Sequence, residues 1–172
     1  MLFVNSYLNM KLKDYLKNVT KKEIFKVGKG DGKQVSCIYN YYNMYKLTND
    51  VYPFVDLIDI NYYYAKKNNL RVHDNFVIEN RDYLFDKLDD GFEGEYHMDI
   101  VDHSQKPCYT FVYYYKISPT IKGGEVEFEN NQIYTPKEND ILCFDGELKH
   151  KVNKISGEGI RGTVIMNIEK LS

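Results

Sequence analysis

The feature that most constrains the fold is a succession of short β-rich segments after residue 70. Each is rich in β-branched and aromatic residues, and turn-forming residues separate it from the next. Many short strands in a row are typical of a β-sandwich or barrel, because such strands bury their apolar faces only when sheets pack or close. The segments are residues 76–80, 94–100, 108–117, 123–129, 132–135, 140–144, 150–155 and 159–168.

The first 70 residues have a different character. Residues 8–19 place leucine and tyrosine side chains at helical spacing, which predicts one helix. A second helix is expected from a cap at Asn49 or Asp50 through about residue 67. Between them, residues 34–46 are β-branched and aromatic enough to predict a strand.

The chain is expected to form one domain. It contains no internal repeat, low-complexity tract or linker, and its 172 residues are the size of a single domain. The motif GKGDGK at 28–33 is expected to be a turn, because it lacks the pattern of a phosphate-binding loop. The sequence therefore predicts an α+β domain of residues 1–172, with a helical part of about 1–70 and a β-rich core of about 71–169.

Composition argues against several classes of partner. The net charge is −2, which gives no overall attraction for nucleic acid or for an anionic membrane. No apolar run approaches the ~20 residues of a membrane span, and no signal-peptide pattern is seen. The three cysteines are scattered, which favours reduced thiols in an intracellular, cytoplasmic protein. Abundant Tyr, Lys, Asn and Ile fit AT-rich codons, as in a large DNA virus or an AT-rich microbe.

The stretch GEYHMDIVDH at 94–103 places His97 and Asp99 two residues apart. On an extended strand this spacing directs both side chains to the same face. An imidazole and a carboxylate together form either part of a metal site or a hydrogen-bonded pair on a wet strand. His150 follows a strand and a short turn, and it is either a third ligand or a surface histidine.

The last predicted strand has two different faces. Val164 and Met166 lie on an apolar face, whereas Arg161, Thr163 and Asn167 lie on the other. This polar face either meets water or looks into a cavity that holds a carboxylate. Arginine suits the second role, because its planar fork binds a carboxylate through two hydrogen bonds and stays charged when it is desolvated.

The order of these residues resembles the iron(II)- and 2-oxoglutarate-dependent dioxygenases, and within them the prolyl-4-hydroxylase-like branch. The resemblance covers residues 83–168. GFEGEYHMD is similar to the glycine-led approach to the family's H-x-D strand, and YTFVYYYKI to the tyrosine-rich strand that follows. Gly123-Gly124 resembles a family turn. YTPKENDILCFDGELKH resembles the turn, strand and loop that carry the second histidine.

The resemblance implies a fold, a site and a reaction. The fold would be N-terminal helices packed on a jelly-roll (double-stranded β-helix, cupin-like) core. His97, Asp99 and His150 would bind Fe(II), and Arg161 would hold the far carboxylate of 2-oxoglutarate, with Thr163 and Tyr114 as further donors. The enzyme would use O2, with ascorbate as a stimulant, to hydroxylate a protein or peptide side chain, most simply a prolyl residue, and would release succinate and CO2.

Two departures and several alternatives accompany this interpretation. The family often has a tyrosine about ten residues before the first histidine, where this chain reads DKLDDG, and collagen-modifying members often use lysine in place of Arg161. An oxidative nucleic-acid demethylase would share the same site residues, and a non-catalytic jelly-roll module would need none of them. A zinc protease is not indicated, because no H-E-x-x-H motif is present.

Overall fold

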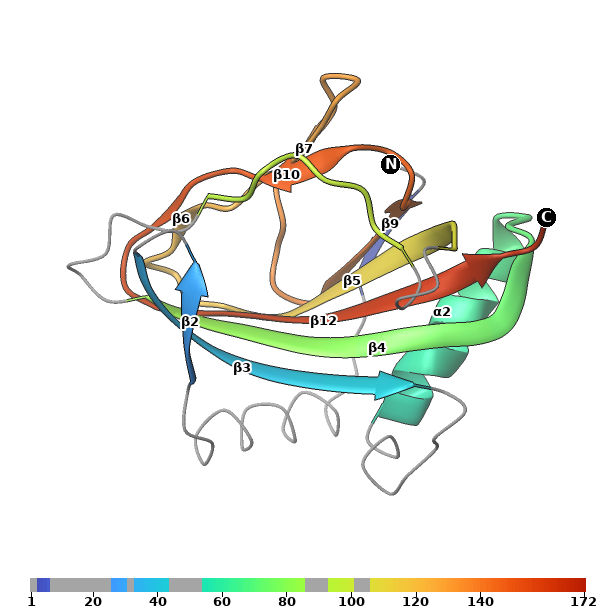
Figure 1. The fold of residues 1–172 in the computed structure, drawn as a ribbon, viewed down its shortest axis with the longest axis horizontal. Helices are drawn as coiled ribbons and strands as arrows, with labels where there is room; N and C mark the ends of the chain where they lie inside the picture. Colours follow the sequence, from blue (N-terminus) through green and yellow to red (C-terminus); the bar gives the residue numbers. More distant parts are fainter. Residues whose placement is uncertain (1–2, 7–25, 31–32, 44–53, 86–92, 101–105) are drawn as a thin grey trace.

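The structure is a computed structural model, and it describes residues 3–6, 26–30, 33–43, 54–85, 93–100 and 106–172. The described elements are one helix, α2 (Val55–Lys67), and twelve strands (Figure 1). The strands are β1 (Phe3–Ser6), β2 (Lys26–Gly30), β3 (Lys33–Asn43), β4 (Val72–Phe85), β5 (Cys108–Ile117), β6 (Lys122–Gly123), β7 (Val126–Phe128), β8 (Ile133–Tyr134), β9 (Asp140–Asp145), β10 (His150–Val152), β11 (Ile155–Ser156) and β12 (Gly159–Lys170).

Seven strands form one large sheet, which we call the major sheet. Their order is β1-β9-β5-β12-β4-β3-β2, and the neighbours for which a register is given run antiparallel. β12 lies in the middle and pairs along most of its length with β5 on one side and β4 on the other. The last strand of the chain therefore holds the two halves of the sheet together.

A second, smaller layer lies over one face of the major sheet. It contains the minor sheet β10-β7-β8 and the short pair β11-β6 (Figure 1). The apolar core between the layers includes Val112 and Tyr114 from β5 and Phe128 from β7. The opposite face of the major sheet is covered by α2, where Leu57 and Ala65 pack against Phe111, Met166 and other sheet residues. This arrangement confirms the predicted fold class, a helix packed on a jelly-roll core.

The described residues of the N-terminal part form three strands and α2. α2 ends at Lys67 as expected, and it begins at Val55; its predicted cap at residue 49 or 50 lies outside the described residues. The predicted helix at 8–19 also lies outside them. However, β1, β2 and β3 all belong to the major sheet. The strand predicted at 34–46 is confirmed by β3, whereas β1 and β2 were not predicted as strands, because strand pairing is decided by partners outside the local sequence.

β12 has the two faces that its sequence predicted. Val164, Met166 and Ile168 point into the core beneath α2, whereas Arg161 and Thr163 line a cavity on the other side. A register shift between β12 and β5 places Tyr114 opposite Thr163. A side chain at Gly162 would collide with the buried ring of Tyr115, so glycine leaves room for that ring.

No helix among the described residues is long and apolar enough to span a membrane.

Leu57 provides a test of the packing between α2 and the major sheet. Its side chain is 1% exposed, so Leu57→Ala should lower the free energy of unfolding by about 2–5 kcal/mol. Val55 begins the same helix and is 40% exposed, so Val55→Ala should change it by less than about 0.5 kcal/mol. Urea unfolding measures both values. Equal effects of the two substitutions would contradict this packing.

Candidate metal centre and adjoining cavity

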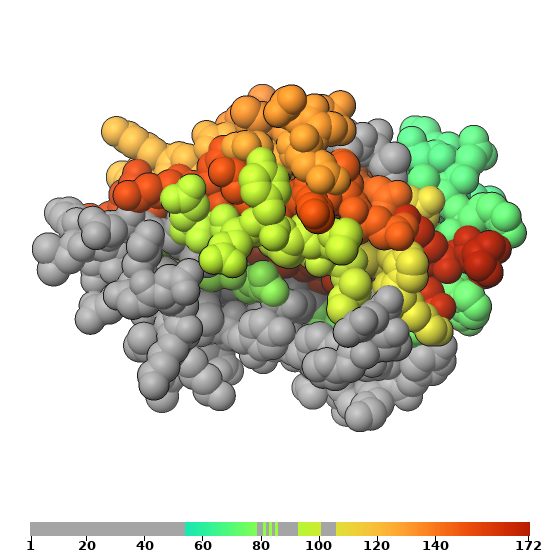
Figure 2. All heavy atoms as spheres, turned by 45° about the horizontal axis from the view of Figure 1, so that its top comes forward, coloured from blue at the N-terminus to red at the C-terminus, as the bar shows by residue number. Residues whose placement is uncertain are grey.

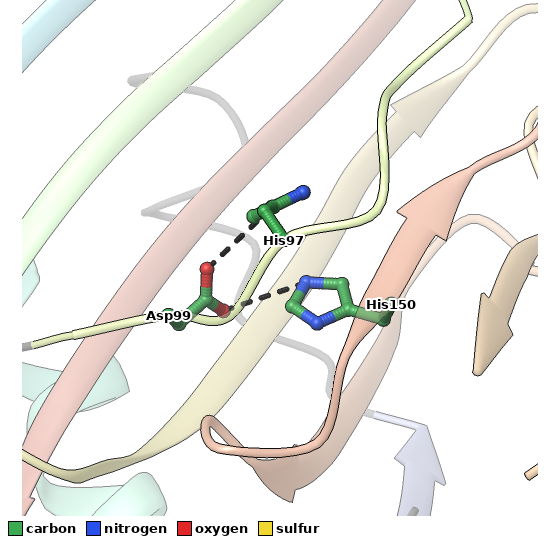
Figure 3. A group of neighbouring side chains, drawn as sticks. All are labelled: His97, Asp99 and His150. Atoms are coloured by element: carbon green, nitrogen blue, oxygen red, sulfur yellow. Dashed lines mark ion pairs between the residues drawn. The ribbon is translucent and has the colours of Figure 1, made fainter. Parts of the chain in front are cut away.

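Three side chains from two segments meet on the inner side of the smaller layer. His97 and Asp99 come from residues 93–100, and His150 is the first residue of β10. Nε2 of His97 lies 3.7 Å from Oδ1 of Asp99, and Nε2 of His150 lies 3.6 Å from Oδ2 of the same carboxylate (Figure 3). One possible ligand atom from each residue lies within 4.8 Å of the other two.

Backbone hydrogen bonds bring these two segments together. The N–H of His97 donates to the carbonyl of His150, and the reverse bond is also made, both at 2.9 Å. The N–H of Asp99 donates to the carbonyl of Gly146 at 2.8 Å. The segment that carries His97 lies across the face of the molecule beside the minor sheet (Figure 2). It was predicted to be a strand, but the only bridge it forms among the described residues is at His97.

Both imidazoles are held in a defined tautomer. Nδ1 of His97 lies 2.8 Å from the carbonyl of Glu95, and Nδ1 of His150 lies 3.0 Å from the carbonyl of Leu148. A carbonyl oxygen only accepts hydrogen bonds, so Nδ1 carries the proton in each ring. Nε2 is then the ring nitrogen available to a metal, and in both residues it faces Asp99. Such a hydrogen bond to the far ring nitrogen is usual for histidines that bind metals.

The surroundings of His150 keep its ring neutral. The residue is 5% exposed, and its ring meets Phe144 edge-on at 4.5 Å between centroids. Burial lowers the pKa of His150, and the opposing attraction of Asp99 does not reverse the shift. The carboxylate of Asp99 is oriented in turn by the hydroxyl of Thr110, which donates to Oδ2 at 2.7 Å.

This donor set fits a single Fe(II) ion. Atoms that are 3–4 Å apart can share one metal at bonds of about 2 Å. Two neutral imidazoles and one carboxylate are the ligands of non-haem Fe(II) oxygenases, in which other coordination positions stay open for substrates. His97 is half exposed, so one side of the site is open to incoming molecules.

A cavity of about 180 Å³ adjoins the three residues and extends toward β12. Its walls are largely apolar, with Val112, Phe144 and Ile165 among them. Arg161, Thr163 and Tyr114 also line it, so the structure brings all six predicted site residues to one cavity. Three consecutive tyrosines occur in β5, and Tyr114 is the one that lines the cavity. Its neighbours Tyr113 and Tyr115 face the opposite core beneath α2.

Arg161 is a buried cation without an ion-pair partner among the described residues. It is 6% exposed, and its Nε forms no hydrogen bond with any of them. Its guanidinium lies over the ring of Tyr114 at 5.2 Å from the centroid. Burial raises the pKa of Tyr114 to about 12, although Arg161 opposes the shift. A buried charge without a partner is costly, and a bound anion would offset that cost.

Comparison with known proteins gives no match from sequence, since neither a family model nor a curated protein matches the chain. Solved structures do match. A prolyl-4-hydroxylase from Pseudomonas putida superposes with a TM-score of 0.67 at 10% identity, over 98% of this chain and 92% of the other. A viral collagen prolyl hydroxylase from Paramecium bursaria Chlorella virus-1, in complex with 2OG, gives 0.67 at 13% identity, over 99% and 96%.

A third match is a prolyl hydroxylase from Trichoplax adhaerens in complex with a hypoxia inducible factor oxygen degradation domain peptide fragment. It gives a TM-score of 0.62 at 14% identity, over 98% of this chain and 83% of the other. The chain has the fold of the 2-oxoglutarate and Fe(II) oxygenases. The resemblance noted in the sequence is thereby confirmed at the level of fold.

One departure from the oxygenase pattern finds an explanation in the fold. Tyr83 on β4 lines the cavity and lies opposite Arg161 in the sheet. Tyr83 thus lies beside Arg161. It precedes His97 by fourteen residues (97 − 83), whereas the resemblance to the family led us to expect a tyrosine about ten residues before it. The missing signal was the strand register, because counting residues back from His97 does not show which side chain the pairing of β4 with β12 brings into the cavity.

Other residues that line the cavity were not identified as site residues from the sequence. Thr110 and Arg81 were not singled out, and Asn167 was assigned only to the polar face of the last strand. Asn167 donates from Nδ2 to the carbonyl of Ile100 at 3.3 Å, next to Asp99. Thr163 donates its hydroxyl proton to the carbonyl of Arg81 at 3.0 Å. A hydroxyl has one proton, so Thr163 must rotate before it can donate to a bound carboxylate.

Proposed function

We propose that the chain is an Fe(II)- and 2-oxoglutarate-dependent dioxygenase that hydroxylates prolyl side chains of a protein substrate, with release of succinate and CO2. One observation carries the proposal: a single cavity is lined both by the His-Asp-His cluster and by the buried Arg161, which has no ion-pair partner among the described residues. This arrangement suits a small molecule that chelates a metal with one end and presents a carboxylate at the other.

The roles of the residues follow from their positions. His97, Asp99 and His150 would hold Fe(II), and Arg161 would bind the far carboxylate of 2-oxoglutarate through its planar fork. When bound, Fe(II) and 2-oxoglutarate supply the oxidising chemistry that turns a C–H bond into C–OH with O2. The protein's own part is to orient these groups and to exclude water. Thr110 keeps Asp99 in position, and Val112 and Ile165 keep the wall apolar.

Tyr114 adds a second donor for the same carboxylate. Because the pKa of Tyr114 is raised to about 12, its phenol stays protonated at neutral pH and can donate a hydrogen bond. The adjacent Arg161 and Tyr114 then present a cation and a neutral donor together. This pair favours a carboxylate over a neutral group at that end of the cavity.

A protein substrate is favoured over nucleic acid by two observations. The three compared structures are named as prolyl hydroxylases, and one of them is in complex with a peptide. The net charge of −2 offers no overall attraction for phosphate backbones. Proline-rich segments also suit an open mouth, because they are already extended and lose little entropy on binding.

The metal assignment is tested by anaerobic addition of Fe(II) and 2-oxoglutarate. The parent protein should develop the weak visible charge-transfer absorption of an Fe(II)–keto acid chelate. His97→Ala and His150→Ala should each abolish it, because each removes a ligand. His73→Ala is the matched control, since this exposed histidine pairs with Asp74, and it should keep the absorption. The assignment fails if both ligand variants bind Fe(II) like the parent.

The role of Arg161 predicts a specific loss of 2-oxoglutarate binding. Arg161→Ala should raise the 2-oxoglutarate concentration for half-saturation by about 10- to 100-fold, because a charged hydrogen-bonded contact contributes roughly 1.5–3 kcal/mol. Arg161→Lys should restore only part, since lysine lacks the planar fork. Arg71→Ala, at an exposed arginine, is the control. An unchanged half-saturation in Arg161→Ala would exclude Arg161 from the cosubstrate site.

The substrate class is tested by incubating the parent protein aerobically with Fe(II), 2-oxoglutarate, ascorbate and separate panels of peptides and oligonucleotides. We expect proline-containing peptides to increase succinate formation and to gain the mass of one oxygen atom on a prolyl residue. Ascorbate is expected to raise the yield. Turnover of methylated oligonucleotides, with the proline peptides inert, would instead support a nucleic-acid demethylase.

A further inference from the structure

The turn between β9 and β10 contacts two of the three residues of the metal centre. The carbonyl of Gly146 accepts the backbone N–H of Asp99 at 2.8 Å, and the carbonyl of Leu148 accepts Nδ1–H of His150 at 3.0 Å. The conformation of residues 145–149 therefore sets the position of the Asp99 backbone and the orientation of the His150 ring.

This turn has an ordered internal structure. The N–H of Leu148 donates to the carbonyl of Asp145 at 2.9 Å, and the N–H of Glu147 donates to Oδ1 of Asp145 at 2.9 Å. The N–H of Gly146 donates to the carbonyl of Cys108 at 2.9 Å. A side chain at Gly146 would lie 2.6 Å from Sγ of Cys108, so the turn sits directly against β5.

Lys170, the last residue of β12, joins both acidic side chains of the turn. Its Nζ lies 2.6 Å from Oδ1 of Asp145 and 2.6 Å from Oε2 of Glu147. The lysine side chain is 15% exposed and lies over the ring of Tyr109 at 5.1 Å. Its backbone N–H donates to the carbonyl of Pro107 at 3.0 Å, so the base of the side chain is also fixed.

Without this ammonium group, two carboxylates two residues apart would face each other in a tight turn. Like charges at that separation repel. Asp145 Oδ1 would still accept the N–H of Glu147, but the exposed side chain of Glu147 would turn further to solvent. The backbone hydrogen bonds of the turn would remain, but the turn that carries the carbonyls of Gly146 and Leu148 would lose its contact with the end of β12.

We propose that Lys170 is a positioning residue for the metal centre, acting through the turn at 145–149 on Asp99 and His150. The inference rests on the proposed function, because it concerns the geometry of that same site. Lys170 does not line the cavity and touches neither the cosubstrate nor the metal ligands. Its effect is to hold two backbone carbonyls in place. Groups that hydrogen-bond directly to metal ligands typically change metal affinity by about 10- to 100-fold, and Lys170 acts one contact further out, so we expect the lower end of that range.

The test compares Lys170→Met with Lys106→Met and Lys170→Arg. Lys106 is the matched control, since its Nζ lies 2.8 Å from Oε1 of Glu169, the neighbour of Lys170 on β12. In the metal-free protein, the Nδ1–H proton of His150 should be observable by NMR as a slowly exchanging signal. Lys170→Met should speed its exchange, whereas Lys106→Met should not, and Lys170→Arg should restore it because the guanidinium can also bridge two carboxylates.

The same three variants are then titrated with Fe(II) in the presence of 2-oxoglutarate. Lys170→Met should weaken Fe(II) binding by about ten-fold, and the other two should stay close to the parent. Glu147→Gln removes only the more exposed of the two contacts and should weaken binding about two-fold, which keeps the test informative if Lys170→Met folds poorly.

The outcomes separate the two proposals. If the parent protein shows no Fe(II)–2-oxoglutarate absorption, the proposed function fails. If the parent shows it, and Lys170→Met and Glu147→Gln both match the parent in His150 exchange and Fe(II) affinity, Lys170 has no positioning role. Equal losses in Lys170→Met and Lys106→Met would also overturn the inference, because they would reflect general destabilisation at the end of β12.

Discussion

The pair of backbone hydrogen bonds between His97 and His150 is the interaction on which the site depends. These residues are far apart in the sequence, and each donates its N–H to the carbonyl of the other at 2.9 Å. The bonds fix the extended segment against β10, and the two-residue period of an extended chain then turns Asp99 to the same side as His97. One register between two short segments therefore brings three potential metal ligands together.

β12 connects the site to the rest of the fold. Its pairing with β5 and β4 fixes the centre of the major sheet, and its two faces serve different purposes. Val164 and Met166 pack beneath α2, while Arg161 lines the cavity that His97, Asp99 and His150 also line. One face of β12 therefore belongs to the apolar core, and the other forms part of the cavity wall.

The parts of this structure that the sequence could predict are those governed by local periodicity. Strict alternation along residues 160–168 placed Arg161 and Thr163 on one face, and the ordered landmarks around His97 and His150 indicated the fold. The inclusion of β1 to β3 in the major sheet could not be predicted in the same way, because strand pairing is decided by distant partners.

Other failures have equally local causes. Tyr83 was missed because a sheet register, and not a distance along the chain, brings it beside Arg161. Thr163 lines the cavity as predicted, but its hydrogen bond to the carbonyl of Arg81 on the paired strand could not be read from the sequence. The segment at 94–100 has the alternation of a strand but forms a bridge only at His97 among the described residues, since alternation marks extended backbone whether or not a ladder forms.

The division of β12 into two faces has an evolutionary consequence. Substitutions at Ile165 or Asn167 alter the cavity wall without touching the core beneath α2, whereas Val164 and Met166 are constrained by that core. A lineage could therefore reshape the cavity wall while it retains the packing beneath α2. The separation is more complete at Asn167 than at Ile165, because Ile165 also packs against the apolar core between the two layers.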